Sequence, residues 1–274
     1  MQKTPVLSNL HTHTSFCDGK NTPEEIVREA IARGMEAIGF SGHSYTPIDT
    51  SYCMSLDATA QYRTEIEHLK KEYGGRIRVL CGLELDRYGA APDTVYDYLI
   101  GSVHYVLLNG EYCVVDMGAD GLKDTVNRHC RGDFYQFARA YYETVATVAD
   151  VTGCDIIGHF DLITKYNEGG RLFDENDPRY LRAATDALDV LLKKDVIFEV
   201  NTGAMSRGYR KSPYPAPTLL RYIAQNGGQV TLNADAHRKE HLLYAFDEAT
   251  HLIRAAGFGS VLTMTQSGWK SRQI

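Results

Sequence analysis

The chain has 274 residues, of which 43% are hydrophobic and 23% charged, and its formal net charge is -6 at pH 7. This length and apolar content allow a sizeable buried core, arranged either as two small domains or as one α/β barrel. The negative balance provides no basic surface of the kind that neutralises the phosphates of a duplex. Long nucleic acid is therefore not an expected partner.

The beginning of the chain and its cysteines favour a soluble protein of a reducing compartment. The first residues, MQKTPVLSNLHTH, contain no apolar run long enough for a secretion signal, and no later segment reaches the length of a transmembrane helix. Six cysteines are scattered without a CxxC pair, which argues against a disulfide framework and a structural zinc ribbon. We expect a cytoplasmic protein without membrane contact, and a monomer.

Short strand-like runs alternate with amphipathic helices along the chain, which predicts βα units on a parallel sheet. The expected strands cover residues 6–10, 37–40, 77–83, 98–103, 155–158, 196–200, 229–232 and 260–263. After a first helix that starts near residue 23, helices are expected at about 57–73, 133–152, 178–194, 216–226 and 240–256. Residues 106–132 and 202–217 are expected to form loops within one domain.

The first helix has clear signals at both ends. Thr22 can cap it, Pro23 occupies the first helical position, Glu25 completes a capping box, and Gly34 follows the last turn. Seven or eight such βα units in a single domain of this length favour a barrel over an open, doubly wound sheet.

Histidines mark the ends of the predicted strands. His11 and His13 form an HxH pair after the first strand, where a period of two points both side chains in the same direction. Asp235 and His237 repeat this spacing after the strand at 229–232, with one oxygen and one nitrogen ligand. An isolated HxH is weak evidence, but two such pairs at strand ends indicate a metal site.

Single candidates lie at the same level of the predicted barrel. They are His43 in GFSGHS, Glu84 in CGLELD, His104 in GSVHY and His159 in IIGHFD, with Asp18 on the first loop. The carboxyl ends of parallel strands open on one face, so residues far apart in sequence converge there. One histidine near a sheet is usually an ordinary hydrogen-bonded residue, whereas six of the ten at corresponding positions favour a common metal centre.

The segments HTHTSFCDGKNTPEEIVREAIARGMEAIGFSGHS, GLELD, GSVHY, GHFD and ADAH together resemble the polymerase and histidinol phosphatase (PHP) superfamily, in particular its histidinol-phosphatase branch. The resemblance covers nearly the whole chain and implies one α/β domain over residues 1–274. Its implied fold is a distorted (β/α)7 TIM-like barrel with a metal site at the C-terminal ends of the strands. One departure is GFSGHS, where many relatives carry Thr-Asp-His and this chain has Gly42.

The same resemblance implies a trinuclear site. One ion would be held by His11, His13, Glu84 and Asp235; Glu84 would bridge to a second ion held by His104 and His159; Asp18, His43 and His237 would hold a third. We expect two or three divalent ions, with zinc, iron and manganese all compatible with imidazole and carboxylate ligands.

Such a cluster suits hydrolysis of a phosphate ester. Our hypothesis is that a hydroxide between two ions attacks phosphorus in line while the third ion binds a phosphoryl oxygen. Asp235 or His237 is expected to protonate the leaving alcohol, unless both are ligands only. Arg207 is the first candidate for binding phosphate through its planar donors, followed by Lys165 and then Arg87.

Aromatic side chains close to the ligand motifs are candidate walls for a flat imidazole ring, although aromatics near strand ends also serve simply as packing. These side chains are Phe16, Tyr45, Tyr105, Phe160 and Tyr166.

The activity implied by the resemblance is hydrolysis of L-histidinol phosphate, a small phosphorylated substrate, in histidine biosynthesis. The residues by themselves indicate only metal-dependent hydrolysis. Alternatives are a related phosphoesterase acting on nucleotides, short oligonucleotides or phosphotyrosine, and a non-catalytic metal-binding module, which would normally lack some of the nine ligands present here. An amidohydrolase-like barrel would add a bridging lysine on a middle strand, and no lysine stands at such a position.

Overall fold

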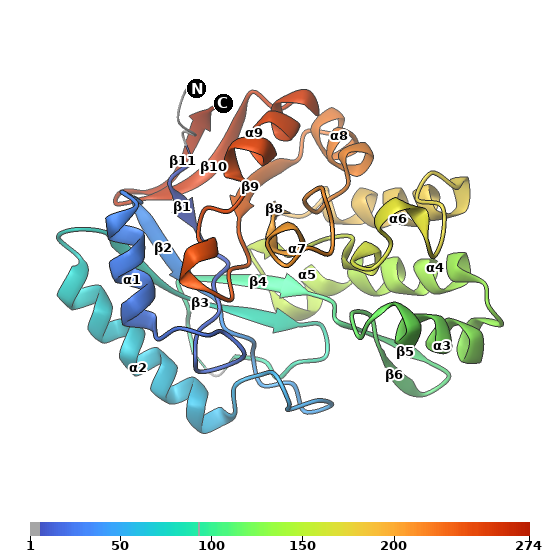
Figure 1. Cartoon of the computed structure of the whole chain (residues 1–274), viewed down its shortest axis with the longest axis horizontal. Helices are drawn as coiled ribbons and strands as arrows, with labels where there is room; N and C mark the ends of the chain where they lie inside the picture. The colour runs from blue at the N-terminus through green and yellow to red at the C-terminus, as the bar shows by residue number, and fades with distance from the viewer. Residues whose placement is uncertain (1–5, 93) are drawn as a thin grey trace.

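A curled, mainly parallel β-sheet forms the centre of the protein, which the computed structural model in Figure 1 describes over residues 6–92 and 94–274. Within these residues the sheet has nine strands in the order β1-β2-β3-β4-β7-β8-β9-β10-β11, and only the last pair is antiparallel. The expected single domain at 1–274 also includes residues 1–5 and 93, which lie outside the described residues. The strands are β1 (Ser8–Asn9), β2 (Ala37–Phe40), β3 (Arg78–Asp86), β4 (Tyr98–Ser102), β7 (Ile156–Ile157), β8 (Ile197–Asn201), β9 (Gln229–Asn233), β10 (Ser260–Thr265) and β11 (Gly268–Gln273).

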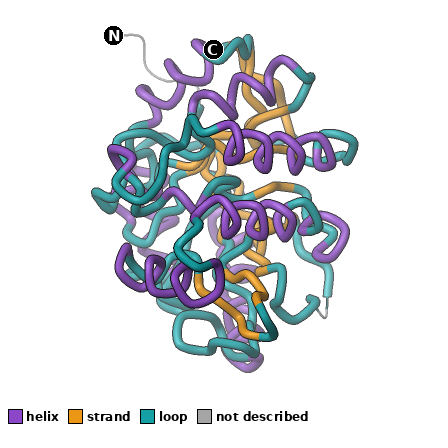
Figure 2. Tube along the Cα trace, turned by 90° about the vertical axis from the view of Figure 1, so that its right-hand side faces the viewer, coloured by secondary structure: helices purple, strands orange, loops and turns teal. Residues whose placement is uncertain are grey.

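Helices lie around the strands, as Figure 2 shows in purple and orange. In the part of the chain that the structure describes, no helix is both long enough and apolar enough to cross a membrane. The helices are α1 (Pro23–Ala32), α2 (Leu56–Tyr73), α3 (Ala119–Cys130), α4 (Phe134–Val145), α5 (Val148–Thr152), α6 (Pro178–Leu191), α7 (Gly203–Ser206), α8 (Pro217–Gln225) and α9 (Phe246–Ala255), with 3-10 turns η1 (Leu162–Thr164), η2 (Glu168–Gly170) and η3 (Lys239–His241).

The sheet closes into a barrel at the C-terminal ends of its strands, where the segments that follow β1 and β9 meet. Thr12 and Ala236 form an isolated parallel bridge there. Next to this bridge, the side chain of Asn9 accepts a hydrogen bond from the backbone N–H of Ala234 at 2.9 Å. The side chain of Asn233 accepts one from the backbone N–H of Leu10 at 2.8 Å. The seven strands β1, β2, β3, β4, β7, β8 and β9 thus enclose a distorted barrel, which confirms the expected fold.

One tyrosine fills the interior of the barrel beneath the strand ends. Tyr98 is 2% exposed, and its hydroxyl donates to the carbonyls of Leu10 at 2.5 Å and Phe40 at 3.0 Å. A Cβ added at Gly39 or Gly82 would lie 2.3 Å from the Tyr98 side chain, so only glycine leaves room for this ring. The barrel is therefore packed below the site rather than open as a pore.

The predicted first helix is confirmed in detail. Thr22 and Glu25 form the capping box, Pro23 begins α1, and Gly34 has a positive φ of 72° just beyond the last turn. The buried face of α1 packs into the main core, and the first loop, which carries Asp18, connects β1 to this helix.

The expected loop at 106–132 is wrong. It contains a hairpin of β5 (Tyr105–Leu108) and β6 (Glu111–Val114), followed by α3. The hairpin turn uses Asn109 and Gly110 with φ of 52° and 85°. An Asn-Gly pair at a two-residue turn is a strong hairpin signal because both positions need positive φ. The signal was present in the sequence, and the hairpin brings new side chains to the mouth of the barrel.

Other boundaries also differ from the expected ones. The helix at 133–152 breaks into α4 and α5 at Ala146 and Thr147, where the N–H of Thr147 donates to the carbonyl of Thr144, three residues back, at 3.1 Å. The helix at 240–256 starts only at Phe246, after η3. Residues 202–217 include the short α7, and β11 pairs with β10 where no strand was expected.

Candidate active site

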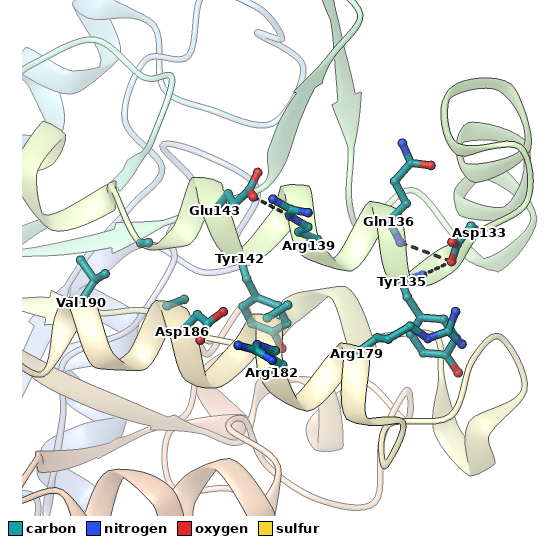
Figure 3. A pocket seen from close by; sticks show the side chains of 13 residues that line it. Asp133, Tyr135, Gln136, Arg139, Tyr142, Glu143, Arg179, Arg182, Asp186 and Val190 are labelled. Carbon is teal, nitrogen blue, oxygen red and sulfur yellow. Dashed lines mark hydrogen bonds and ion pairs between the residues drawn. The ribbon is translucent and has the colours of Figure 1, made fainter.

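A hollow of about 760 Å³ lies between α4 and α6, as Figure 3 shows, but its side chains do not form a reactive group. Arg139 pairs with Glu143 at 2.8 Å, and Arg179 stacks over Tyr135 at 3.9 Å from its ring centre. Over the described residues its lining includes none of the predicted metal ligands. The size of a hollow therefore does not locate the functional site in this protein.

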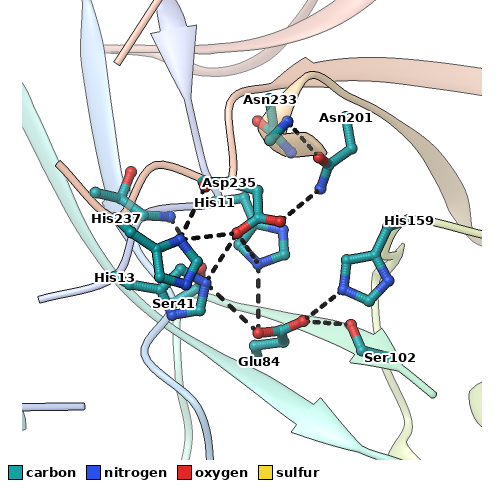
Figure 4. A network of polar contacts seen from close by, with 12 residues as sticks. His11, His13, Ser41, Glu84, Ser102, His159, Asn201, Asn233, Asp235 and His237 are labelled. Carbon is teal, nitrogen blue, oxygen red and sulfur yellow. Dashed lines mark hydrogen bonds and ion pairs between the residues drawn. The ribbon is translucent and has the colours of Figure 1, made fainter. Parts of the chain in front are cut away.

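The predicted ligands instead come together at the C-terminal ends of the barrel strands. Figure 4 shows several of them pointing inward from different strands. His11 and His13 follow β1, His43 follows β2, and Glu84 belongs to β3 itself. All nine positions reach this one region: His11, His13, Asp18, His43, Glu84, His104, His159, Asp235 and His237.

Four of these side chains face one another closely at the barrel axis. His11 Nε2 lies 3.4 Å from Glu84 Oε2 and 3.8 Å from Asp235 Oδ1. His13 Nε2 lies 3.6 and 3.2 Å from the same two oxygens. A tetrahedral ion with bonds of about 2.0–2.2 Å separates its donor atoms by about 3.3–3.6 Å. This spacing fits a shared divalent ion.

The other carboxylate oxygen of Glu84 faces a second pair of histidines. Glu84 Oε1 lies 3.0 Å from His159 Nε2 and 3.7 Å from His104 Nε2, and it accepts a hydrogen bond from Ser102 at 2.6 Å. Burial would raise the pKa of Glu84, but His43 and His11 outweigh it and hold the pKa well below its usual value. Glu84 thus stands as a carboxylate between two groups of imidazoles.

A third group forms on the side of the first loop. Asp18 Oδ2 lies 3.0 Å from His237 Nε2, and Asp18 Oδ1 lies 3.7 Å from His43 Nε2. His13 joins the same group, with its Nδ1 3.5 Å from Asp18 Oδ1 and its ring stacked on that of His237 at 4.1 Å between ring centres. Asp18, His13, His43 and His237 can together surround a metal ion.

Several atoms of these groups are buried without a hydrogen-bond partner in the described part of the chain. They include His11 Nε2, His13 Nε2, Asp18 Oδ1 and Glu84 Oε2. An unpaired buried polar atom costs about 1–3 kcal/mol, so four in one place call for a common partner. Imidazole nitrogens and carboxylate oxygens at these separations fit divalent ions.

Two carboxylates that the sequence analysis missed orient the histidines from behind. Glu199 Oε1 accepts from His11 Nδ1 at 2.7 Å, and Asp86 Oδ2 accepts from His104 Nδ1 at 3.2 Å. Burial opposes a charge on His11, but Glu199, Glu84 and Asp235 together raise its pKa well above the usual value. The available signal was an acidic residue inside an apolar strand, in IFEVN and in GLELD.

Gly42, at which the sequence departs from the motif expected from the resemblance, has tightly packed surroundings. A Cβ at Gly42 would lie 3.1 Å from Met54 Cε and 3.3 Å from Cys17 Sγ. Cys17 itself lies 3.6 Å from His13 Nδ1. His43 itself lies in the site, with its Nδ1 2.8 Å from Glu84 Oε2.

Arg207 lies against the ligands, at the end of α7. Its guanidinium donates to Asp235 Oδ2 at 3.0 Å, and its Nη1 lies 2.8 Å from His237 Nδ1. Asp235 has a positive φ of 47°, and a Cβ at Gly203 would approach its carboxylate to 2.7 Å. Only glycine at 203 therefore lets α7 bring Arg207 this close. Burial opposes the charge, but Asp235 raises the pKa of Arg207.

Lys165 follows η1 and reaches the same cavity from the other side. Its Nζ donates to Asp116 Oδ2 at 2.8 Å and lies 5.4 Å from the ring centre of Tyr209. Burial opposes the Lys165 charge, yet Asp116 raises its pKa. Arg87, the third candidate, instead donates to Thr147 at 2.8 Å and is absent from the described lining of the cavity.

The cavity above the ligands has a volume of about 330 Å³. Of the five aromatics expected to wall it, Tyr105 does so, whereas Phe160 is buried in the core and Phe16 packs edge-on against Tyr62. Neither Tyr45 nor Tyr166 belongs to the described lining. Tyr52, from the segment between β2 and α2, and Tyr209, from the segment after α7, line the cavity instead.

Comparison with known proteins places this geometry in a family. Residues 9–203 match the model of the PHP domain. A Deinococcus radiodurans protein named "Probable histidinol-phosphatase" is 32% identical over 267 residues, which span 92% of this chain and 94% of that protein. The histidinol-phosphatase of Bacillus subtilis is 25% identical over 260 residues, or 86% of this chain and 96% of that protein.

A solved structure has the same fold. The crystal structure of histidinol phosphate phosphatase from Lactococcus lactis, complexed with zinc, L-histidinol and phosphate, matches with a TM-score of 0.68 at 22% identity. The match covers 97% of this chain and 99% of that one. With a family model that spans most of the barrel and a relative that aligns along nearly its whole length, the chain belongs to the PHP domain family, in its histidinol-phosphatase branch.

Proposed function

We propose that this protein is a metal-dependent phosphomonoesterase that hydrolyses L-histidinol phosphate to L-histidinol and phosphate. The observation that carries the proposal is the convergence of nine imidazole and carboxylate ligands beneath a cavity whose wall presents Arg207 and Lys165. The substrate follows from the relatives, which are named histidinol-phosphatases, and from the Lactococcus lactis complex with L-histidinol and phosphate.

We propose a trinuclear arrangement, which is supported by three clusters of side chains that could each hold an ion: His13 with Asp18, His43 and His237; His11 with His13 and Glu84; and His43 with Glu84 and His104. His11, His13, Glu84 and Asp235 would hold one ion, Glu84 with His104 and His159 a second, and Asp18 with His43 and His237 a third. Zinc, iron and manganese all suit these ligands. When bound, divalent ions lower the pKa of water and neutralise phosphoryl oxygens, which is the chemistry that a phosphate monoester requires.

The cationic side chains of the cavity wall bind and orient the phosphate group. Arg207 offers a planar set of donors, and its Nε is buried without a hydrogen-bond partner among the described residues. Lys165 adds a second positive charge, held in place by Asp116. Together these two side chains fix the ester so that its leaving oxygen faces the ligand groups.

The leaving alcohol needs a proton, and Asp235 and His237 are the candidate donors. Both line the cavity, and both contact Arg207, at 3.0 Å from Asp235 and 2.8 Å from His237. Asp235 is ionised, because burial would raise its pKa but Arg207 and His11 outweigh burial and hold the pKa well below the usual value. It would therefore first take a proton from the attacking water and then pass it to the ester oxygen as the bond to phosphorus breaks. The product alcohol then leaves through the same opening.

The direct test is phosphate release from L-histidinol phosphate by protein loaded with zinc, iron or manganese. Nucleotides, phosphotyrosine and an aryl phosphate serve as competing substrates. We expect strong preference for L-histidinol phosphate, loss of activity on chelation and recovery on adding metal. Activity confined to another ester would support the metal-dependent mechanism but rule out L-histidinol phosphate as the substrate. Absence of hydrolysis with every metal and ester would favour a metal-binding module instead.

The proposal also includes the oligomeric state, the location and the pathway that the sequence analysis predicts. The enzyme would act as a monomer in the cytoplasm, on a small substrate, and within histidine biosynthesis. The described lining of the cavity is consistent with a small ester, because a volume of about 330 Å³ lies at the lower end of the range for small-molecule sites.

A further inference from the structure

Glu199 of β8 is a fully buried carboxylate in which both oxygens are saturated with hydrogen bonds. Oε1 accepts from His11 Nδ1 at 2.7 Å and from Asn233 Nδ2 at 3.0 Å. Oε2 accepts from the backbone N–H of His159 at 3.0 Å and from Asn201 Nδ2 at 2.8 Å. Because each oxygen already accepts two hydrogen bonds, neither has a lone pair free to bind an ion. Glu199 is therefore not itself a ligand.

The contacts of Glu199 reach two proposed ligands on different strands. His11 Nδ1 can meet this carboxylate at 2.7 Å only by donating its proton, so the neutral ring has its lone pair on Nε2. That lone pair faces Glu84 Oε2 at 3.4 Å and Asp235 Oδ1 at 3.8 Å. The opposite tautomer would place a proton where the ion is to bind.

The same network extends to a third ligand and to the closure of the barrel. Asn201 Nδ2, which donates to Glu199, also lies 3.5 Å from Asp235 Oδ2. Asn233 donates to Glu199 and accepts from the backbone of Leu10 at 2.8 Å. Glu199 thus connects β1, β7, β8 and β9 at the level of the ligands.

We propose that Glu199 is a positioning residue for metal binding: it fixes the tautomer and orientation of His11, holds the backbone that carries His159, and adds a negative charge behind the ligands. This inference rests on the proposed function only in that His11 and His159 are taken to hold ions. Partners behind metal-bound histidines raise their basicity, and their loss typically costs about 10–100-fold in metal affinity.

The test is Glu199→Gln, measured as binding of Zn²⁺ alone in competition with a chromophoric chelator. Glutamine keeps the size but turns an amide group toward two donors, so we expect about 10–100-fold weaker Zn²⁺ binding at the tightest site. Glu175→Gln is the matched control, because Glu175 is a partly buried carboxylate that pairs with Arg210 and contacts none of the nine ligands. Its Zn²⁺ affinity should equal that of the unchanged protein.

A second measurement uses the unchanged protein and does not depend on the variant folding. Nitrogen-15 NMR of the zinc-loaded protein, in which the ion would occupy Nε2 of His11, should show a protonated Nδ1 on His11 with a strongly downfield proton, and this signal should disappear in Glu199→Gln. Circular dichroism reports whether the variant is folded. Folded Glu199→Gln with Zn²⁺ affinity within threefold of the unchanged protein, or zinc-loaded protein in which His11 is protonated on Nε2 instead of Nδ1, would overturn the proposal.

These readouts separate the inference from the proposed function. If no ester is hydrolysed but the variant loses Zn²⁺ affinity and the His11 signal, the activity assignment fails and the role of Glu199 stands. If L-histidinol phosphate is hydrolysed while both Zn²⁺ affinity and the His11 signal are unaffected by the substitution, the reverse holds.

Discussion

The two halves of the cavity are built differently. The floor is formed by the nine proposed ligands: Asp18, His43, Glu84, His104, His159, Asp235 and His237 line the cavity, and His11 and His13 lie against Glu84 and Asp235. The rim consists of Asp49, Tyr52, Tyr105, Asp116, Lys165, Arg207 and Tyr209. Most floor residues are buried and come from strands or their ends. Rim residues come from loops and the β5–β6 hairpin and are tied by pairs such as Tyr105 to Asp49 at 3.0 Å.

This difference indicates which part of the cavity controls metal binding and which part controls substrate binding. A floor fixed by strands and by buried partners such as Glu199 and Asp86 holds the chemistry in one arrangement. A rim on loops can vary without disturbing the barrel, as is common in enzymes of this architecture. Changes in the floor should therefore affect metal binding, whereas changes in the rim should affect substrate binding and turnover with the metals retained.

The largest effect is expected from Glu84→Gln, which removes the carboxylate shared by two groups of histidines. Bound metal contributes several kcal/mol to phosphate ester cleavage, so we expect phosphate release to fall by about 10³-fold or more, together with weaker Zn²⁺ binding. Elemental analysis after dialysis and steady-state phosphate assays measure both. Glu143→Gln, on the exposed face of α4, is the control. Full metal content with full activity would show that Glu84 does not belong to the floor.

A smaller effect is expected from Arg207→Ala at the rim. Removing a preorganised cation from the phosphate site should lower kcat/KM by about 10²–10³-fold, with Zn²⁺ content unchanged. Arg207→Lys should recover only part, because lysine lacks the planar fork. The matched control is Arg179→Ala, on the exposed start of α6. Loss of zinc from Arg207→Ala would contradict the division between floor and rim. Arg207 would then be needed for metal binding, through its 3.0 Å contact with Asp235.

The smallest effect is expected from Lys165→Met. This change keeps the length of the side chain but removes its charge, and we expect a rise in KM of about tenfold with a smaller change in kcat, because one charge-assisted contact is worth about 1.5–3 kcal/mol at most. Initial rates over a range of substrate concentrations separate the two constants. Lys211→Met, on an exposed loop residue, should match the unchanged protein. An unaltered KM in Lys165→Met would remove Lys165 from substrate binding.

The structure also shows how far reasoning from residues can reach. Strand-end positions such as His104 and His159 were predictable, because apolar runs with a polar residue at their end recur with a regular pattern and parallel strands share one open face. The hairpin at Asn109 and Gly110 carried its own signal and could have been found. Tyr52 and Tyr209 line the cavity in place of the expected Phe16 and Phe160, and no local pattern in the sequence indicated this.

The sequence by itself determined the alternation of strands and helices, the capped first helix, and the set of candidate ligands at the strand ends, since these depend on local pattern and on the direction of parallel strands. Only the tertiary structure decided which atoms face one another. The saturation of Glu199, the pairing of Lys165 with Asp116, and the approach of Arg207 to Asp235 join segments far apart in the chain. Their geometry arises when the barrel closes, because contacts between distant residues depend on how all strands pack and not on any local pattern.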